Sequence, residues 1–358
     1  MSKHLLFIFL LPFWLTAETI ETFYGPMELD EPVLIELIHH PAIQRLKKIH
    51  QYGVSFYTTS FNENYNRYDH SIGVFAILRH YNAPLKEQIA GLLHDVSHTV
   101  FSHVGDWMFG KENQEADYQG TIHTIFLKKS GLATILEKYQ ISAEEVLPLE
   151  KYFPMLEQKG PKLCADRIDY NIQGAYYRGF ITYDEALILF NRFQFHDGVW
   201  IHLESELMKK LVYFSLYMTE KCWGSAGNHF LSKTLAEAVL RGVELGIISY
   251  DEIHHGTDDA IWEKLTHSYD PFIQARVEAL YYPKQYYNLV DNPTEADIIV
   301  RSKFRGIDPF VLYNGQIRTL TSLDPLLKQK YHETSETMLK GWPIKFFNVP
   351  LIAQIEAR

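Results

Sequence analysis

QIAGLLHDVSH, residues 88–98, is the stretch that decides the fold. It is an apolar helical run that ends in a histidine and an aspartate, and the apolar side chains of Ile89, Leu92 and Leu93 indicate a buried helix. Its end, His94–Asp95, is then buried as well. A buried carboxylate is costly unless it is paired or bound to a metal. The stretch therefore predicts a packed helical domain with a charged centre at this helix end.

Two further segments supply residues that one divalent metal could collect together with His94 and Asp95. His70 lies in a helical pattern that begins near Arg67, and Asp166 lies on the apolar helix around residues 163–170. Two imidazoles and two carboxylates can bind a metal and leave positions open for water and substrate. Asp169 follows Asp166 by three residues and can share its helix face, but we expect it to form an ion pair with an arginine. A second ring of groups that can exchange protons comprises His98, His103, Asp106 and His123.

Composition limits the classes of function. The chain has 358 residues, 46% of them hydrophobic, which is ample for a packed interior. The formal net charge of −10 argues against wrapping a nucleic-acid duplex, whereas a small anionic substrate needs only a few local cations. The two cysteines, Cys164 and Cys222, have no C-x-x-C partners, which excludes a disulfide framework and a zinc ribbon.

Hydrophobic periodicity predicts a mainly α fold. Helices are expected over residues 31–52, 67–78, 85–94, 121–136, 161–177, 183–190, 204–245 and 326–338, with a turn and a helix over 96–108 and a loop over 53–66. Alternating residues around the turn His196-Asp197-Gly198 predict a hairpin, so we assign this second His-Asp pair no chemistry. Residues 297–301 and 309–320, with Asn314-Gly315 between apolar runs, predict another hairpin, and 344–347 a last strand.

Three regions follow from these patterns. Residues 1–17 have a basic start, an apolar run from Leu5 to Leu15 and a small residue, Ala17, which predicts a signal peptide and export to the periplasm or the medium. A buried N-terminal segment of a cytoplasmic protein is the alternative. Residues 18–285 form the helical core, and residues 286–358 form a small mixed α/β region. No later stretch is long and apolar enough to predict a membrane span.

Several separated motifs, in order, resemble the HD-domain metal-dependent phosphohydrolases, a family named for its His…His-Asp…Asp ligand set. The resemblance is greatest to the branch of deoxynucleoside triphosphate triphosphohydrolases and covers about residues 22 to 180. It rests on the segments Tyr24–Leu29, Pro41–Gly53, Asn66–Val74, Gln88–His98, Phe101–His103 and Asp166–Tyr170. The resemblance implies an all-helical HD core that hydrolyses a nucleotide or another small phosphate ester.

The resemblance also implies roles for individual residues. It assigns the ligands of one divalent ion, of the kind Mn, Fe, Co, Ni or Mg, to His70, His94, Asp95 and Asp166. It makes His123 the catalytic acid/base, positioned by Asp106, and the ordinary pKa of a histidine suits that role near neutrality. His98 and His103 would line the phosphate site, Arg67 and Arg167 would bind phosphate, and Gln51 and Tyr170 would contact the sugar.

Two departures from the branch keep alternatives open. Thr124 follows His123 where the branch usually has glutamate, and the stretch Lys221–His229 offers few of the arginines and tyrosines that grip a triphosphate there. A triphosphohydrolase proper, a phosphodiesterase, and a non-catalytic HD protein that binds a nucleotide or a partner therefore remain alternatives. Assembly into a homo-oligomer is left open.

Overall fold

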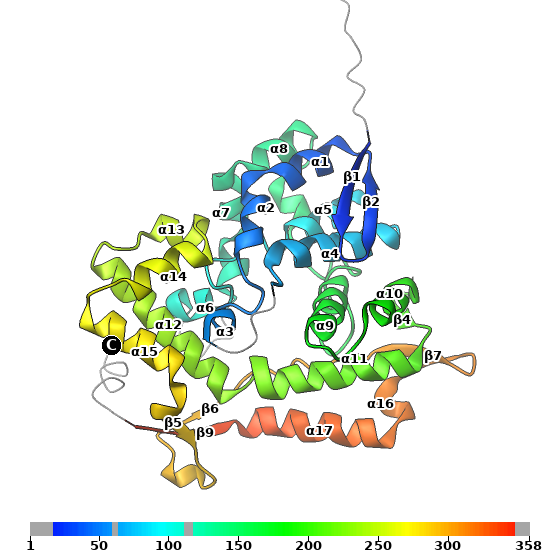
Figure 1. Cartoon of the computed structure of the whole chain (residues 1–358). Coiled ribbons are helices and arrows are strands. Elements are labelled where there is room, and N and C mark those ends of the chain that lie inside the picture. The colour runs from blue at the N-terminus through cyan, green and yellow to red at the C-terminus, as the bar shows by residue number, and fades with distance from the viewer. Residues whose placement is uncertain (1–16, 59–63, 111–116, 348–358) are drawn as a thin grey trace, which may run out of the picture.

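The computed structural model describes residues 17–58, 64–110 and 117–347, and over these residues the protein is mainly helical with three small sheets (Figure 1). The predicted class, mainly α with a small mixed C-terminal region, is confirmed. Apart from Ala17, the predicted signal peptide lies outside the described residues, and so does part of the predicted loop 53–66. No helix in the described ranges is long and apolar enough to cross a membrane.

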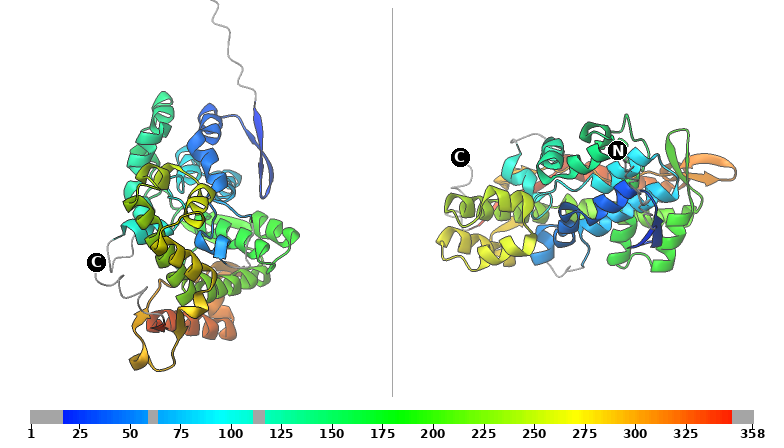
Figure 2. Two further views of the ribbon diagram at one scale, coloured as in Figure 1. Left: turned by 60° about the vertical axis from the view of Figure 1, so that its left-hand side comes forward. Right: turned by 90° about the horizontal axis from the view of Figure 1, so that it is seen from above.

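The first half of the chain packs around the helix that carries His70. It begins with a hairpin of β1 (Glu18–Thr22) and β2 (Gly25–Leu29), which stands at the edge of the helical body in both views of Figure 2. The helices that follow are α1 (Pro32–His39), α2 (Pro41–Arg45), η1 (Leu46–Lys48), α3 (Val54–Thr58), α4 (Arg67–His80), α5 (Leu85–Leu93), α6 (Val104–Phe109), α7 (Tyr118–Ser130), α8 (Leu132–Lys138), η2 (Ala143–Val146), α9 (Ala165–Tyr177) and α10 (Tyr183–Asn191).

The second half begins with a strand pair and continues with long helices. In Figure 1, α11 and α12 follow one another across the molecule and α17 runs below them. The elements are β3 (Phe193–His196), β4 (Val199–His202), α11 (Ser205–Tyr217), the π-helical turn η3 (Met218–Trp223), α12 (Ala226–Glu244), α13 (Tyr250–His255), α14 (Asp258–Thr266), α15 (Pro271–Tyr281), η4 (Pro283–Gln285), β5 (Tyr287–Leu289), η5 (Pro293–Glu295), β6 (Ile298–Val300), β7 (Phe310–Tyr313), β8 (Gln316–Thr319), α16 (Leu320–Leu323), α17 (Pro325–Lys340) and β9 (Trp342–Phe346).

Local sequence explains where several elements begin and end. Proline occupies the first turn of α1 and of α2, where a missing N–H costs no hydrogen bond. Gly131, with φ +89°, divides the predicted helix 121–136 into α7 and α8. The predicted loop 53–66 was wrong at α3, because the buried side chain of Val54 and the stacking of Phe56 on the His50 ring hold one helical turn there.

The two predicted hairpins have different outcomes. The strands β3 and β4 pair as predicted, around a turn in which Asp197 and Gly198 both have positive φ. The second prediction was correct for β7 and β8 but not for residues 297–301, because β6 pairs with β9 in a separate sheet of order β5-β9-β6. Strand β7 instead lies parallel to β4 and completes a sheet of order β3-β4-β7-β8 that joins residues on both sides of position 285.

Two hydrophobic cores lie side by side. The first is built around α1, α4, α5 and α7 to α11, and the second around α6, α12 to α15 and the β5-β9-β6 sheet. The helices α4 and α9 cross closely at Gly73, where an added Cβ would lie 2.0 Å from Oδ1 of Asp169. This close crossing brings the predicted ligand positions of α4 and α9 together, while the end of α5 approaches from the same core.

Candidate functional site

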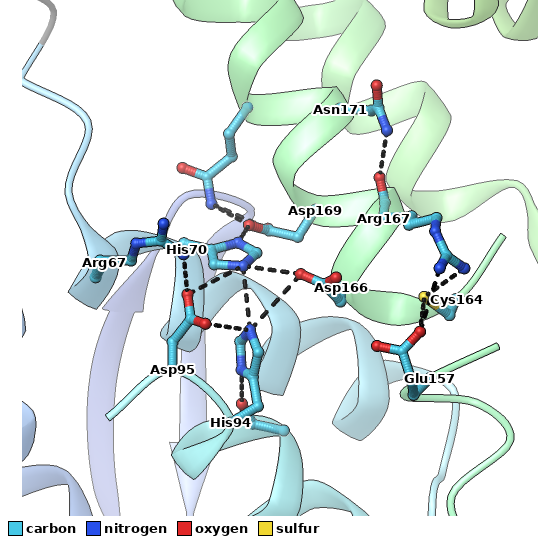
Figure 3. A network of polar contacts seen from close by, with 12 residues as sticks. Arg67, His70, His94, Asp95, Glu157, Cys164, Asp166, Arg167, Asp169 and Asn171 are labelled. Carbon is cyan, nitrogen blue, oxygen red and sulfur yellow. Dashed lines mark hydrogen bonds and ion pairs between the residues drawn. The ribbon is translucent and has the colours of Figure 1, made fainter. Parts of the chain in front are cut away.

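Four side chains from three helices converge on one point (Figure 3). His70 comes from α4, His94 and Asp95 from the end of α5, and Asp166 from the first turn of α9. Nε2 of His70 lies 3.2 Å from Nε2 of His94 and 3.0 Å from Oδ1 of Asp166. Oδ2 of Asp95 lies 3.6 Å from Nε2 of His70, and its Oδ1 lies 3.5 Å from Nε2 of His94. Nε2 of His94 lies 3.6 Å from Oδ1 of Asp166.

The donor atoms of His70, His94 and Asp95 lie within 4.8 Å of one another, as the ligands of one ion would, and Asp166 adds an oxygen beside both histidines. Donor atoms bound to one metal at about 2.1 Å lie roughly 3.0–3.4 Å apart in octahedral or tetrahedral geometry. The other ring nitrogens are already used, since Nδ1 of His70 lies 2.7 Å from Oδ2 of Asp169 and Nδ1 of His94 lies 2.7 Å from the carbonyl oxygen of Gly91. Both Nδ1 atoms therefore carry the proton, and the two Nε2 lone pairs face each other. A cation between them is the group that this arrangement suits.

The charges around this point also favour a bound cation. Burial opposes ionisation of His70, but hydrogen bonds to Asp166 and Asp169 raise the pKa of His70 to about 10. The pKa values of Asp95 and Asp166 are lowered despite their burial, by Arg67 in the first case and by His70 in the second. The carboxylates thus stay ionised and attract positive charge, which a proton or a metal ion can supply.

His123 is buried and belongs to the same neighbourhood. Its Nδ1 lies 2.7 Å from Oγ of Ser97, and its Nε2 has no hydrogen-bond partner among the described residues. Burial, reinforced by the charge of His94, lowers the pKa of His123 to about 4, which corrects the expected pKa near neutrality. The predicted support by Asp106 was wrong, because Ser97 holds the ring.

Asp106 serves the next histidine instead. It lies 3.2 Å from Nδ1 of the exposed His103 and accepts the backbone N–H of Tyr118 at 3.0 Å. His98 is buried, and its Nε2 lies 3.3 Å from Oδ1 of Asp95. The rings of His98 and His103 are 5.0 Å apart, so these histidines form a path from the cluster to the surface.

The two arginines have different surroundings. Arg67 is buried and donates to Oδ2 of Asp95 at 2.6 Å and to Oγ of Ser102 at 3.0 Å. Arg167 donates to the carbonyl oxygens of Gln158 and Lys162 and to Oε1 of Glu157, turned away from the cluster in Figure 3. It also contacts Cys164, so the donor group Glu157, Cys164 and Asp166 already has a cation beside it.

The predicted sugar contacts lie near the cluster to different degrees. The half-buried Tyr170 ring is 6.3 Å from the ring of His70 and packs edge to face on Trp223, which belongs to η3. The charge of Arg305 acts on its hydroxyl, against the burial that raises the pKa of Tyr170. Gln51 has a buried Oε1 with no hydrogen-bond partner in the described chain.

Sequence reasoning missed three residues that support the site. Asp169 accepts from Tyr24, Gln173 and His70, and the ion pair expected for it with Arg167 or Arg178 is not what holds it. Its spacing of three from Asp166 was a usable signal. Ser97 and Trp223 carried no signal, because their contacts are long-range.

Comparison with known proteins identifies the family. The HD domain matches residues 67–151. The uncharacterized protein YdhJ of Bacillus subtilis is 33% identical over 309 residues, which cover 84% of this chain and 90% of that protein. The metal-dependent phosphohydrolase cns2 of Cordyceps militaris is 39% identical over 163 residues, 46% of each chain. The human deoxynucleoside triphosphate triphosphohydrolase SAMHD1 is 30% identical over 143 residues, 34% of this chain and 22% of that protein.

The fold has a solved counterpart as well. A crystal structure of a phosphohydrolase from Bacteroides thetaiotaomicron superposes with a TM-score of 0.64 at 15% identity, over 92% of this chain and 99% of that chain. With the converging His and Asp residues, these findings define the class. The chain belongs to the HD-domain family of metal-dependent phosphohydrolases.

Proposed function

We propose that this protein hydrolyses a nucleotide or another small phosphate ester with one divalent ion held by His70, His94, Asp95 and Asp166. The observation that carries the proposal is the convergence of two Nε2 lone pairs and two ionised carboxylates at one point. When bound there, such an ion lowers the pKa of a water molecule and polarises a phosphoryl oxygen.

The chain supplies the proton transfers. Nδ1 of His123 and Oγ of Ser97 are hydrogen-bonded at 2.7 Å, so neutral His123 can accept from Ser97 at Nδ1 and carry its own proton on Nε2. If His123 becomes a cation, Nδ1 can donate to Ser97, whose hydroxyl then donates to the carbonyl oxygen of Gln119 at 3.3 Å. Nδ1 thus has a partner in both protonation states, and Nε2 is left to exchange its proton with the leaving oxygen, as an acid/base group requires. The anionic substrate favours the cation and offsets the burial that lowers the pKa of His123.

An aromatic wall supports a nucleotide over a simpler ester. Tyr170 and Trp223 pack edge to face beside the cluster, and burial and the charge of Asp166 raise the pKa of Tyr170 against the charges of Arg167 and Arg305. Aromatic rings and a guanidinium suit a base or sugar and its phosphate. The similarity to human SAMHD1, a deoxynucleoside triphosphate triphosphohydrolase, also supports a nucleotide substrate. The more specific alternatives are that the protein is a triphosphohydrolase or a phosphodiesterase.

The test is a phosphate-release screen on protein loaded in turn with Mn²⁺, Mg²⁺, Co²⁺, Ni²⁺ and Fe²⁺. Nucleoside mono-, di- and triphosphates, a nucleoside phosphodiester and p-nitrophenyl phosphate are the substrates. Metal content and turnover should both be lost in His94→Ala. His196→Ala is the matched control, because His196 belongs to the other His-Asp pair and is exposed in the β3–β4 turn. Equal loss in both variants would contradict the proposal.

One residue favours a non-catalytic rival. Thr124 follows His123 and cannot serve as the second acid/base that a glutamate would offer. A protein that binds metal and nucleotides but releases no phosphate from any substrate in the screen would be this binding protein. Tight nucleotide binding, measured by titration calorimetry on the same metal-loaded samples, distinguishes that outcome from an inactive preparation.

A further inference from the structure

A buried carboxylate from the second half of the chain reaches the loop next to the metal centre. Asp258, at the start of α14, is fully buried. Its Oδ1 accepts the backbone N–H of Phe101 at 2.6 Å, and its Oδ2 accepts the backbone N–H of His50 at 2.8 Å. These partners are 157 and 208 residues away in the sequence, and Asp258 lies outside the segment that the HD domain matches.

The carboxylate is not used to cap its own helix. The side chain of the N-cap residue of α14, Thr257, makes no capping hydrogen bond, and both oxygens of Asp258 are directed to the distant backbone. A purely local role in starting α14 therefore does not explain these contacts.

The loop that Asp258 holds is strained. Phe101 and Ser102 have φ of +59° and +56°, a backbone conformation that residues other than glycine rarely adopt. The neighbouring Gly53 is packed against the loop so closely that an added Cβ would lie 2.5 Å from the carbonyl oxygen of Phe101. Such a conformation persists only where its surroundings hold it, and the two hydrogen bonds from Asp258 are part of that support.

From the loop, the contacts continue to the cluster. Oγ of Ser102 donates to the carbonyl oxygen of His50 at 2.7 Å and accepts Nε of Arg67 at 3.0 Å. Arg67 then donates to Oδ2 of Asp95 at 2.6 Å. Both the amide and the carbonyl of His50 thus take part in this series of hydrogen bonds, which leaves the side chains of Ser102 and Arg67 little freedom.

A half-buried arginine fixes the other side of the same loop. Arg45 donates to the carbonyl oxygens of His98 at 2.5 Å and of Val96 at 3.3 Å, and also to that of Gly256 at 3.1 Å. Gly256 precedes Asp258 by two residues, so Arg45 and Asp258 tie the α13–α14 junction to both ends of the segment that follows Asp95.

We propose that Asp258 is a positioning residue for the metal centre. It fixes the loop 98–102, this loop fixes Arg67, and Arg67 fixes the carboxylate of Asp95. The proposal rests on the proposed function of that centre. It means that the second core of the protein takes part in shaping the ligand set of the first.

The test compares three full-length variants with wild type. Asp258→Asn keeps the size but turns an amide N–H toward a backbone N–H, so one of the two contacts is lost. Ser102→Ala removes the hydrogen bonds that link the loop to Arg67, in the middle of this series of contacts. Asp270→Asn is the matched control, since Asp270 also accepts two backbone N–H groups, those of Phe272 and Ile273, in the same second core but away from the site. Mn²⁺ affinity is measured by calorimetric titration, and amide exchange is followed by mass spectrometry.

In Asp258→Asn we expect Mn²⁺ affinity to fall about tenfold or more and exchange to quicken at His50 and Phe101. Ser102→Ala should weaken Mn²⁺ binding similarly, and the double variant should lose little more than either single one, because both act through one path. Asp270→Asn should keep wild-type Mn²⁺ affinity.

Three outcomes would overturn the proposal. Asp258→Asn with Mn²⁺ affinity within twofold of wild type refutes it while leaving the metal centre intact. Wild-type protein that binds no Mn²⁺ refutes both this proposal and the proposed function. If Asp258→Asn does not fold, Ser102→Ala becomes the test of the proposal. Unchanged Mn²⁺ affinity in Ser102→Ala would then refute positioning of Asp95 through Ser102 and Arg67.

Discussion

At the scale of single residues, His70 shows how the site is prepared for a cation. Its Nε2 faces the cluster, and its Nδ1 is bound to Asp169 at 2.7 Å. Asp169 is completely buried and also accepts from Tyr24 at 2.8 Å and from Gln173 at 2.9 Å. A carboxylate with so many donors is held in place, fixes the tautomer of His70 and makes its free nitrogen a better ligand.

Asp169→Asn should therefore weaken divalent-metal affinity by about 10- to 100-fold while the fold is kept. The asparagine has the same size and can still accept from His70, but it lacks the charge. Calorimetric titration with Mn²⁺ measures the effect. Asp308→Asn is the control, because its carboxylate binds the backbone N–H and the hydroxyl of Thr321 in α16 and no residue of the cluster within the described part of the chain. Equal affinities in the two variants would show that Asp169 is merely structural.

His123→Ala should leave metal content unchanged and slow turnover by roughly 10²–10⁴-fold, because an acid/base group is removed and no predicted ligand is touched. Ser97→Ala should slow turnover less, since it removes only the partner of Nδ1. Metal analysis and the rate on the best substrate of the screen measure both effects. A wild-type rate in His123→Ala would place the acid/base elsewhere.

Much of the cluster could be predicted residue by residue from the sequence, but the residues that hold its side chains in place could not. His94 and Asp95 were predictable because an apolar run makes a buried carboxylate conspicuous. The pairing of Asp106 with His103 instead of His123 depends on how α6 and α7 approach each other, which no spacing along the chain records. The same holds for Arg167, whose partners are carbonyl oxygens of a turn that has no pattern.

At the scale of elements, the two helices that carry carboxylates are tied through a turn between them. Glu87, on α5, is buried and accepts the backbone N–H groups of Met155 at 2.8 Å and Leu156 at 3.0 Å. The carbonyl oxygen of Met155 then accepts the N–H of Ala165, the first residue of α9, at 2.7 Å. The distance between Asp95 and Asp166 is thus set by backbone contacts as well as by helix packing.

The β3–β4 hairpin contains a group that makes stability depend on pH. Nδ1 of the buried His202 accepts the N–H of Glu204 at 2.9 Å, and its Nε2 donates to the carbonyl oxygen of Leu189 at 3.1 Å. Burial lowers the pKa of His202 to about 4, below the 6.5 of an unfolded histidine. The unfolded chain therefore binds a proton first, and stability is lost as the pH falls from 6.5 toward 4.

His202→Asn should accordingly be less stable at pH 7.5 but lose less free energy of unfolding on acidification to pH 4.5. The difference can reach roughly 3 kcal/mol, since one pKa unit corresponds to about 1.36 kcal/mol. Urea unfolding at both pH values measures it. His196→Asn, in the same hairpin but exposed, serves as the control. Equal pH dependence of wild type and His202→Asn would show that His202 is not the group responsible.

Elements were predictable where periodicity or turn chemistry is local. The helices α4, α5, α9 and α10 and the hairpins at Asp197-Gly198 and Asn314-Gly315 follow from such signals. The short α3 was not predictable, because tertiary packing of Val54 and Phe56 holds it. The pairing of β6 with β9 could not be predicted either, since about forty residues separate the strands and each is short.

At the scale of the whole molecule, the site depends on more than the segment that the HD domain matches. Asp166 lies beyond residue 151, Trp223 packs on Tyr170 from a later part of the chain, and Asp258 holds the loop 98–102. A truncated HD segment would lack one proposed ligand and the aromatic wall. Functional measurements therefore need the full chain.

Export is the remaining proposal about the whole molecule, and it predicts a mature protein that begins at Glu18. The strand β1 starts at that residue, pairs along its length with β2 and buries Ile20 in the first core. Cleavage after Ala17 would thus remove the apolar run from Leu5 to Leu15 and leave the strand whole.

N-terminal sequencing of protein from the exported fraction measures this, and Glu18 is the expected first residue. Ala17→Trp should leave an uncut precursor, because a signal peptidase requires a small residue before the cleaved bond, while the hairpin and its partner β2 are untouched. Ser2→Ala, at the other end of the segment, should be processed like wild type. An intact Met1 on a species confined to the cytoplasm would overturn the export proposal and would favour an enzyme acting on intracellular phosphate esters, with the same cluster at its centre.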